Sequence, residues 1–452
     1  MISLLPPLDS AAAILGPQRP EASETRPSRF CFRVPCDDGT LLYHTLTQEL
    51  LLLEPGDRAE ELRDTLYAGR FLVPETQDET RLAAQLRQIA GFLQPPKPGI
   101  TSYLIFPTTD CNARCAYCFE LTRRRLNMSD RIAHDAAAYI RGHCAGQKVK
   151  LRWFGGEPLF HTRALELITA DLRQMDVRFE SQMTSNGFLF DEALVQTAKN
   201  DWKLRQIQIT LDGTEAVYNR TKAYVHSEGS AYQRVLRNIG LLLDAEIRVV
   251  LRLNIGLSNW EDMLALADEL SARFPDRALL TVYPALLRDY GPKKNSADQR
   301  RELMERFTRV YRRLEENGLR RKPVLPRTIR LNECMADSDN SLSILPDGTL
   351  GKCEHESENG SVGSIYSDAL NAEALASWRE RLEIDACRTC VLYPQCTHLK
   401  RCGSFPEGCD EFVRAERLFD LRERVLNSYE LEKSRRSGSG PAFRPAEDVE
   451  LC

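Results

Sequence analysis

Cysteine is the residue type in this 452-residue chain whose spacing points most directly to chemistry, because ten of its 14 copies lie in two windows. One window has the spacing C-x3-C-x2-C, and the other holds seven cysteines nearer the C-terminus. Disulfides are rare in a reducing cytosol, so clustered thiolates there indicate metal binding. The first group is Cys111, Cys115 and Cys118, and the second is Cys334, Cys353, Cys387, Cys390, Cys396, Cys402 and Cys409.

The composition is that of a cytoplasmic, multidomain protein. Apolar residues make up 42% and charged residues 28%, the usual balance of a soluble globular protein. With 61 basic and 65 acidic residues, the formal charge of −4 excludes a strongly basic nucleic-acid binder. No apolar run is long enough for a membrane span, and the N-terminus lacks the pattern of a signal peptide. We therefore expect a cytoplasmic protein with no nucleic-acid partner and no membrane partner.

The elements that position the first cysteine group alternate between strand and helix, which predicts parallel strands joined by right-handed crossovers. Six such units suit an α/β fold with an open, partial (β/α)6 barrel, whose catalytic residues lie at the C-terminal ends of the strands. Residues 111–118 directly follow the first strand, at that end. The expected strands are 102–108, 148–154, 178–185, 205–212, 247–256 and 278–285, and the expected helices are 129–143, 162–175, 191–199, 231–243, 260–273 and 296–317.

Regions of different composition flank the barrel and set the expected domain boundaries. Residues 1–28 are rich in Pro, Ala and Ser and are expected to form a flexible tail. Residues 29–94 have the pattern of short strands and two helices, and the stiff PPKPG linker opens the barrel at 95–329. Residues 330–412 are rich in cysteine and loops, so metal would have to supply their cohesion. Residues 413–452 are expected to form a charged helix and a flexible tail.

Three thiolates after a strand can bind three irons of a [4Fe–4S] cube and leave the fourth iron open. The spacing of Cys111, Cys115 and Cys118, with an aromatic residue at Tyr117, resembles the signature of the radical S-adenosylmethionine (SAM) enzymes. That resemblance implies that the amino and carboxylate groups of SAM chelate the open iron. It also implies that the reduced cluster cleaves SAM and releases a 5′-deoxyadenosyl radical, which abstracts hydrogen from a substrate. The alternative is a zinc site, which needs a fourth ligand that is not evident here.

Short glycine-containing motifs end the next three strands and resemble the SAM-binding positions of the same family. The motifs are WFGGEP, TSNG and LDG, and each alone is more often an ordinary strand terminus. By resemblance the first contacts the SAM amino group, and the others lie near the ribose and carboxylate. Four polar residues on or beyond strand ends could bind the carboxylate or have an ordinary surface or barrel-lining role: Arg220, Lys222, Arg252 and Asn254. The motif residues assigned to SAM are Gly155, Gly156, Glu157, Pro158, Ser185, Asn186 and Asp212.

The second cysteine group resembles the SPASM extension of radical SAM enzymes, which holds two auxiliary iron–sulfur clusters. The chain departs from that pattern in two ways. Five residues, where the family usually has three, separate Cys396 from Cys402, and no cysteine lies between Cys334 and Cys353. By the resemblance one cluster is bound by Cys387, Cys390, Cys396 and Cys409, and the other by Cys334, Cys353 and Cys402.

One auxiliary cluster would therefore have only three protein ligands. We hypothesise that its open iron accepts the thiolate of a substrate cysteine. Cys31, Cys36, Cys452, a histidine or water could fill that position instead. Structural zinc knuckles are the alternative for the whole region.

Residues 29–94 resemble the winged-helix element that binds leader peptides in many peptide-modifying radical SAM enzymes. Such an element takes up an extended leader as an added strand at its sheet edge. A structural cap on the barrel and a DNA-binding winged helix are the alternatives, and the acidic helices (AEELRD, QDET) argue against DNA. Cys31 and Cys36, in the first strand of this unit, are expected to be packing residues.

Together the resemblances imply a radical SAM/SPASM maturase of a ribosomally synthesised and post-translationally modified peptide (RiPP). The implied cofactors are SAM and three [4Fe–4S] clusters, and the implied partners are a precursor peptide with a leader and a flavodoxin or ferredoxin reductant. A substrate thiolate on the open iron would make the product a cysteine sulfur-to-carbon thioether.

Three other activities fit the same motifs. One is a carbon–carbon or carbon–oxygen (cyclophane-type) crosslink. Another is anaerobic sulfatase-type maturation of a cysteine or serine to formylglycine, for which Glu354 stands where an acidic base is expected. The last is a peptide-binding or electron-transfer protein with an inactive SAM site.

Overall fold

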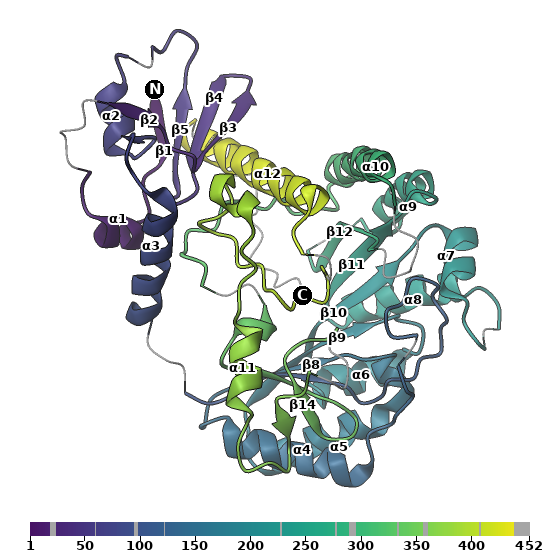
Figure 1. The fold of residues 1–452 in the computed structure, drawn as a ribbon. Coiled ribbons are helices and arrows are strands. Elements are labelled where there is room, and N and C mark those ends of the chain that lie inside the picture. Colours follow the sequence, from purple (N-terminus) through teal and green to yellow (C-terminus); the bar gives the residue numbers. More distant parts are fainter. Residues whose placement is uncertain are drawn as a thin grey trace.

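The computed structural model describes residues 1–18, 24–58, 60–94, 98–121, 123–226, 228–275, 278–288, 295–331, 334–355, 360–405 and 408–437. Figure 1 shows an N-terminal unit and a larger α/β unit, with the cysteine-rich segment running between them. The long helix α12 (Glu411–Arg436) extends from the N-terminal unit toward α10 (Ala297–Glu316) of the larger unit (Figure 1). No helix in this described part of the chain is long and apolar enough to cross a membrane.

A nine-stranded sheet, in the order β12-β11-β10-β9-β8-β7-β13-β14-β15, is the framework of the larger unit. The six strands from β7 to β12 pair in parallel, so the α/β fold expected from the alternating pattern is confirmed. These strands are β7 (Ser102–Ile105), β8 (Val149–Trp153), β9 (Phe179–Ser185), β10 (Leu204–Leu211), β11 (Arg248–Ile255) and β12 (Leu280–Leu286). The expected helices are α4 (Asp130–His143), α5 (Thr162–Gln174), α6 (Glu192–Asn200), α8 (Ala231–Asp244), α9 (Trp260–Arg273) and α10.

Alternate residues of these strands face opposite sides of the sheet. In β8, Val149, Leu151 and Trp153 are buried in the main apolar cluster with residues of the surrounding helices. The residues between them, Lys150 and Arg152, are only half-buried and face the other way. The sheet therefore has one apolar face under the helices and one polar face that is available for a site.

The sequence pattern does not predict α7 (Glu215–Lys222), which follows β10. Its eight residues are mostly polar, so no apolar period marks it. The helix begins after Thr214 and ends before Ala223, whose φ of 44° is left-handed. Its buried side chains, Tyr218 and Lys222, point back into the larger unit.

The cysteine-rich segment contributes strands to the barrel sheet, which its loop-rich sequence does not predict. β13 (Ser341–Ile344) pairs in parallel with β7. β14 (Thr349–Gly351) and β15 (Gly363–Ser364) continue the sheet in antiparallel fashion. All four residues of β13 are buried, because it lies inside the sheet and not at its edge. Strands of two to four residues carry too little periodicity to be recognised in the sequence.

The N-terminal unit is built on an antiparallel sheet of order β1-β5-β4-β3. The expectation that residues 1–28 lack fixed structure is wrong for the described residues, since they hold two strands and a helix. Leu4 of the first strand is buried in one apolar cluster with Leu50 and Leu52, which offsets the entropy cost of ordering the segment. The elements are β1 (Ile2–Leu5), α1 (Asp9–Leu15), β2 (Thr25–Pro27), β3 (Cys31–Cys36), β4 (Gly39–His44), β5 (Glu49–Leu53), α2 (Arg63–Ala68), β6 (Leu72–Pro74) and α3 (Glu79–Leu93).

Helix α12 completes the core of the N-terminal unit from the other end of the chain. Leu421, Val425 and Tyr429 share an apolar cluster with residues of β3, β4 and β5. Lys433 pairs with Asp38 in the turn between β3 and β4. The expected C-terminal helix is therefore present and belongs to the N-terminal unit by its packing. The flexible tail expected after it lies mostly outside the described residues.

Candidate functional site

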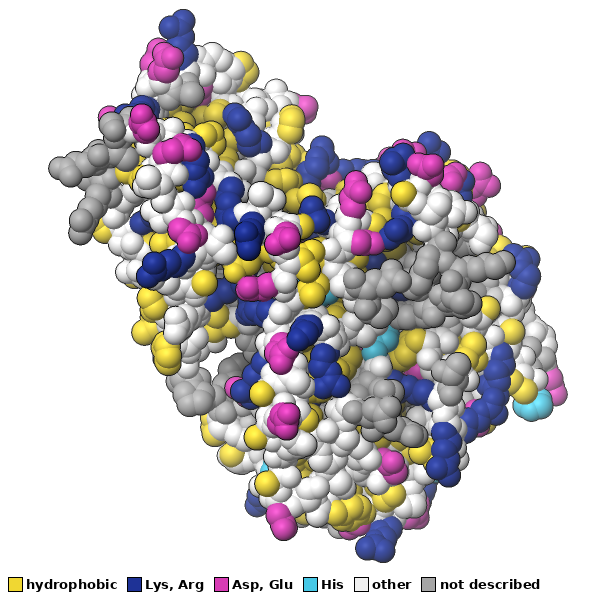
Figure 2. Space-filling view, viewed as in Figure 1, with side chains coloured by type: hydrophobic (Ala, Val, Ile, Leu, Met, Phe, Trp, Pro, Cys, Tyr) yellow, Lys and Arg dark blue, Asp and Glu magenta, His cyan; other side chains and the backbone are white. Residues whose placement is uncertain are grey.

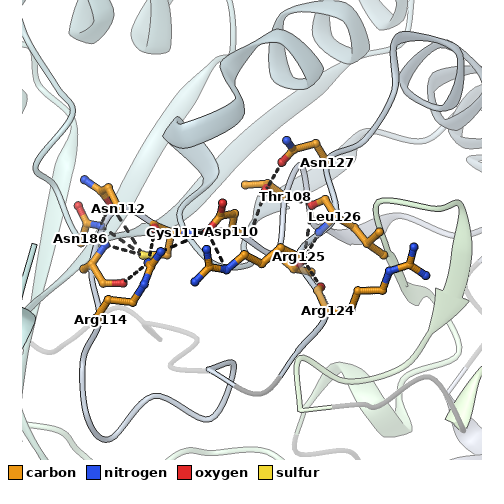
Figure 3. A network of polar contacts seen from close by, with 12 residues as sticks. Thr108, Asp110, Cys111, Asn112, Arg114, Arg124, Arg125, Leu126, Asn127 and Asn186 are labelled. Carbon is orange, nitrogen blue, oxygen red and sulfur yellow. Dashed lines mark hydrogen bonds and ion pairs between the residues drawn. The ribbon is translucent and has the colours of Figure 1, made fainter. Parts of the chain in front are cut away.

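The first cysteine group lies in the loop between β7 and α4, where backbone hydrogen bonds tie it to several neighbours. The Cys111 amide donates to Asp110 Oδ1 at 2.8 Å, and the Arg114 amide donates to the carbonyl of Lys222 at 2.9 Å. Asn186, from the end of β9, reaches the same loop, where its Nδ2 donates to Asn112 Oδ1 at 2.7 Å (Figure 3). The loop is thus fixed against the C-terminal ends of the neighbouring strands.

The thiols of this loop are close enough to influence one another. Burial raises the pKa of Cys111 to about 12, and the charges of Glu157, Cys115 and Cys118 add to the shift. Burial likewise raises the pKa of Cys118, with a contribution from Cys115. Thiols that resist ionisation alone are the ones that a cationic metal centre would stabilise as thiolates.

The WFGGEP turn passes directly under the cysteine loop. A Cβ atom at Gly155, whose φ is +114°, would lie 2.2 Å from the carbonyl oxygen of Thr108. A Cβ atom at Gly156 would lie 2.1 Å from the carbonyl oxygen of Asp110. Both contacts are far closer than atoms can approach, so glycine is required at both positions.

Glu157 joins the second and third strand ends. Its carboxylate is 1% exposed and accepts hydrogen bonds from Ser185 Oγ at 2.8 Å and from the Asn186 amide at 2.7 Å. A third donor is the Leu159 amide, in the turn opened by Pro158. Burial raises the pKa of Glu157 to about 7, although these hydrogen bonds oppose the shift. A buried carboxylate of this kind can bind an amino group.

A buried ion pair connects the fourth strand end with α7. Asp212 and Lys222 are 1% and 3% exposed, and Lys222 Nζ lies 2.7 Å from Asp212 Oδ2. Tyr117 Oη donates to Asp212 Oδ2 at 2.6 Å, and Asn254 Nδ2 donates to Asp212 Oδ1 at 3.0 Å. Burial acts to lower the pKa of Lys222, but the carboxylate outweighs it and holds that pKa well above its usual value. Arg220 lies exposed on α7, apart from this network.

Apart from Arg220, the structure therefore brings the candidate positions of the sequence analysis to one edge of the sheet. Two of them, Asp212 and Lys222, neutralise each other and serve the framework of the site. Arg252, next to the network, donates from its Nε to Asn254 Oδ1 at 2.9 Å.

The second cysteine group divides into two sets in space. Cys353 belongs to the first, because its pKa is raised by burial and further by Glu354, Cys334 and Cys402. The other set surrounds one small cavity together with four arginines. The residues of that cavity include Cys387, Cys390, Cys396, Cys409, Arg87, Arg381, Arg414 and Arg417.

The cysteines of these two sets are free thiols in the described part of the chain. Within the described ranges, no three Cys, His, Asp or Glu side chains form a group that could hold a metal ion, and no disulfide joins the cysteines. A [4Fe–4S] cube takes one sulfur on each of its irons, so it requires thiolates spread around a cavity. Arginines beside such a cavity would balance the negative charge of the thiolates.

Arginines from distant elements hold the four-cysteine set, and the sequence contains no signal for them. Arg87 of α3 donates to the carbonyls of Pro394 at 3.0 Å and Cys396 at 2.8 Å. Arg381 also donates to the carbonyl of Cys396, at 3.2 Å. Arg87 and Cys396 are 309 positions apart, so no local motif could connect them.

The two cysteine regions meet beside the first loop. Arg123, five residues after Cys118, donates to the carbonyl of Glu354. The ring of Phe119 packs on His355, with centroids 4.1 Å apart. The Cys353–His355 stretch of the second region thus covers the loop of the first.

Comparison with known proteins agrees with this arrangement. Residues 105–270 match the family model of the radical SAM superfamily. The GTP 3′,8-cyclases of two Clostridium perfringens strains are 31% identical over 113 residues, which is 24% of this chain and 34% of each relative. The chain thus spans about a third of the length of these relatives.

Solved structures show the same fold at low identity. Native anSMEcpe with bound AdoMet overlays with a TM-score of 0.55 at 13% identity, covering 74% of this chain and 99% of that one. Native anSMEcpe with bound AdoMet and the Kp18Cys peptide overlays with a TM-score of 0.54 at 14% identity, covering 74% of this chain and 99% of that one. SuiB of Streptococcus suis bound to S-adenosylmethionine gives a TM-score of 0.48 at 13% identity, with coverages of 86% and 99%, which is too low to show a shared fold. Residues 105–270 of this chain form a radical SAM domain.

Proposed function

We propose that this chain is a radical SAM maturase of a ribosomally synthesised peptide and closes a cysteine sulfur-to-carbon thioether in it. The observation that carries the proposal is the contact between the two cysteine regions. Phe119 and Arg123, which follow the first thiol loop, touch Glu354 and His355, which follow Cys353. A substrate residue placed between the regions would therefore meet both.

The residues at the strand ends fit SAM bound on a [4Fe–4S] cluster of Cys111, Cys115 and Cys118. When bound, the two together supply a 5′-deoxyadenosyl radical that removes hydrogen from the substrate. Glu157 would accept hydrogen bonds from the SAM amino group, and Gly155 and Gly156 let the backbone approach closely. The buried pair of Asp212 and Lys222 joins the end of β10 to α7 at the rim of the site.

The cysteine sets of the C-terminal region fit two auxiliary clusters, which makes three [4Fe–4S] clusters in all. The set of Cys334, Cys353 and Cys402 offers three thiolates, and a substrate cysteine would supply the fourth. Cys31 and Cys36 do not compete for that position, because they pack in apolar clusters of the N-terminal unit. Cys452 lies outside the described residues. A flavodoxin or ferredoxin would supply the electrons.

The N-terminal unit fits a leader-peptide site. β3 is an outer strand of its sheet, and no further strand among the described residues pairs with it. An extended leader could add to that edge through main-chain hydrogen bonds. The peptide itself would be a precursor with a leader and a cysteine-containing core.

The test is the anaerobic reaction of the reconstituted enzyme with SAM, a reductant and a candidate precursor peptide, followed by mass spectrometry with thiol alkylation. We expect 5′-deoxyadenosine, loss of two hydrogens from the peptide and loss of an alkylatable thiol. Cys115→Ala should abolish 5′-deoxyadenosine release, whereas Cys353→Ala should retain release and lose the crosslink. If the peptide loses two hydrogens but its thiols can still be alkylated, the product is a carbon–carbon or carbon–oxygen crosslink and not a thioether. Release of 5′-deoxyadenosine while the peptide stays unchanged would refute the peptide as substrate.

A second candidate function is formylglycine formation, and the observation that favours it is the buried carboxyl group of Glu354. Burial raises the pKa of this carboxyl group, while Arg152 and Arg252 from the polar face of the sheet oppose the shift. A desolvated carboxylate beside the site could accept a proton from a substrate thiol or hydroxyl. The same mass spectra decide between the candidates, because formylglycine made from cysteine loses the sulfur and a thioether keeps it.

A further inference from the structure

An arginine-lined cavity lies at the β12 edge of the barrel sheet, apart from the thiol loop. Its volume is about 790 Å³. One wall is β12, and the others come from α10, α12, the segment 320–330 and loops of the cysteine-rich region. Cavities of this size enclose small molecules or short stretches of peptide.

The charge of the lining is opposite to that of the whole chain. Six arginines and two carboxylates give the lining a formal charge of +4, whereas the chain carries −4. On the surface, by contrast, basic and acidic side chains are interspersed over the face shown in Figure 2. The arginines are Arg320, Arg321, Arg327, Arg330, Arg417 and Arg424, and the carboxylates are Glu416 and Asp420.

Several of these arginines are held by neutral groups. Arg320 donates to the Tyr311 hydroxyl at 3.0 Å, and its guanidinium lies 4.0 Å from the centre of that ring. Arg321 donates to the carbonyl of Ala278 at 3.0 Å. Arg330 forms no ion pair with any residue that the structure describes. These contacts position the guanidinium groups and leave their charge uncompensated.

Both carboxylates of the lining are already occupied. Asp420 pairs with Arg424 at 2.7 Å. Glu416 pairs with Arg288 at 2.7 Å. They therefore add little to the neutralisation of the other arginines, and a concave lining of low dielectric strengthens the field of those arginines.

The cavity touches each unit that a bound peptide would meet. Tyr283 of β12 donates to Gln208 Oε1 on the polar face of the sheet at 2.8 Å. Cys396, from the four-cysteine set, forms part of the lining. Arg327 donates to the carbonyl of Gln48 in the N-terminal unit. The cavity thus lies between the N-terminal sheet and the polar face of the barrel.

We propose that this cavity binds an acidic segment of the substrate peptide, between the part held by the N-terminal unit and the residue presented to the barrel. The inference rests on the proposed function and adds a substrate class: a peptide with Asp or Glu side chains in that segment. Guanidinium groups bind carboxylates through paired, charge-assisted hydrogen bonds. Phe405, Phe419 and Pro284 supply apolar wall for the rest of the segment.

An acidic reductant protein is the other partner that the charge would attract. A folded carrier presents its carboxylates on a convex surface and would cover the mouth of the cavity without filling it. An extended peptide can enter and bring its carboxylates to the arginines along the walls. The shape of the site therefore favours the peptide.

The test is fluorescence anisotropy with the full-length, cluster-reconstituted enzyme. The probe is a labelled short peptide of alternating Glu and Ala, compared with peptides that carry Gln or Lys in place of Glu. We expect the Glu peptide to bind at least about tenfold more tightly than the Gln peptide, and to weaken with salt. The double variant Arg321→Glu/Arg330→Glu should lose at least about tenfold in affinity for the Glu peptide.

The pair of substitutions Arg131→Glu/Arg163→Glu is the matched control, because those side chains are 85% and 57% exposed on α4 and α5 and carry the same change of charge away from the cavity. It should bind the Glu peptide within about twofold of the wild type. Iron content and circular dichroism verify that the double variant is folded. Equal binding of the Glu and Gln peptides, or equal binding by the double variant, would overturn the proposal.

Two further outcomes separate this proposal from its alternatives. If the double variant binds the Glu peptide normally but is reduced more slowly by flavodoxin, the cavity serves the reductant and the peptide assignment is wrong. Release of 5′-deoxyadenosine by the wild type reports on the proposed function independently. An enzyme that binds the Glu peptide and cleaves no SAM would refute the proposed function and retain the acidic site.

Discussion

The two cysteine regions of this chain rest on different frameworks. The first is a short loop whose backbone bonds to its neighbours, with Arg114 N to Lys222 O and Thr109 N to Leu126 O both at 2.9 Å. In the second, side chains from distant elements hold the loops, as Arg87 of α3 holds the carbonyl of Cys396 at 2.8 Å. One framework is backbone at the ends of neighbouring strands, and the other consists of side chains that reach irregular loops.

If the proposed clusters are bound, this difference indicates which region depends on them for its fold. The first loop is attached to a parallel sheet with a large buried apolar face, whose packing supplies cohesion of its own. Among the described residues of 381–409, which carry the four cysteines, regular structure is limited to the 3-10 helix η4 (Asp385–Thr389) and an isolated bridge between Arg381 and Leu399. Cluster binding should therefore be coupled to folding in the second region far more than in the first.

Removal of iron is the strongest test of this comparison. After anaerobic chelation, we expect amide hydrogen exchange in 385–409 to accelerate by roughly 10⁴-fold, because a structural metal centre contributes many kcal/mol to its own domain. Strands β8 to β11 should keep their protection. Hydrogen-exchange mass spectrometry reports both regions in one experiment. Equal loss of protection in both regions, or no loss in either region, would show that the frameworks do not differ.

Loss of the buried ion pair should be the next largest effect, and it should fall on the first region. Lys222→Met leaves the carboxylate of Asp212 buried without its cation, which costs about 3–5 kcal/mol in comparable pairs. Urea unfolding followed by tryptophan fluorescence measures this cost, because Trp153, Trp202 and Trp260 lie in the barrel unit.

Two further variants control that measurement. Lys199→Met breaks the exposed pair of Lys199 and Glu246 by the same change and should cost less than about 1 kcal/mol. Adding Asp212→Asn to Lys222→Met should restore part of the stability, because it removes the stranded charge. A cost for Lys222→Met no greater than that for Lys199→Met would mean that the pair does not hold the site.

The same contrast explains what the sequence could predict. The first region follows from local patterns: alternating strands and helices, a C-x3-C-x2-C loop and glycine turns, where a Cβ at Gly155 or Gly156 would clash with the backbone. The role of Arg87 depends on a contact between residues 309 positions apart, which no local pattern encodes, and Arg381 contacts Cys396 across 15 residues of irregular loop. No pattern marks β1 and β13 either, because four residues carry too little periodicity to outweigh their surroundings.

Arg87 offers a smaller test of the second framework. Arg87→Gln removes donors from the carbonyls of residues 393–396, and burial already lowers the pKa of Arg87 to about 10. We expect a local cost of about 1–3 kcal/mol, seen as faster exchange in 385–409 and a lower iron content. Arg81→Gln, at an exposed position on the same helix, should change neither. Loss of protection in the barrel instead would contradict the separation of the two regions.

The smallest expected effect concerns Glu157 and the pH dependence of the first region. Burial raises its pKa from 4.5 to about 7, so between these values the folded chain binds more protons than the unfolded chain. Without ligand, the stability contributed by this group therefore falls as pH rises from about 4.5 to 7.

Binding of SAM should depend on pH in the opposite direction. An amino group donates more strongly to an ionised carboxylate than to a neutral acid, so SAM should bind about tenfold more tightly at pH 8 than at pH 6. Equilibrium dialysis with the oxidised, reconstituted enzyme measures this without turnover. Glu157→Gln should bind SAM with the same, weaker affinity at both pH values. If the affinity of the wild type for SAM were equally independent of pH, Glu157 would be a structural link between Ser185 and Asn186 and not a SAM contact. The two regions would then differ less than proposed.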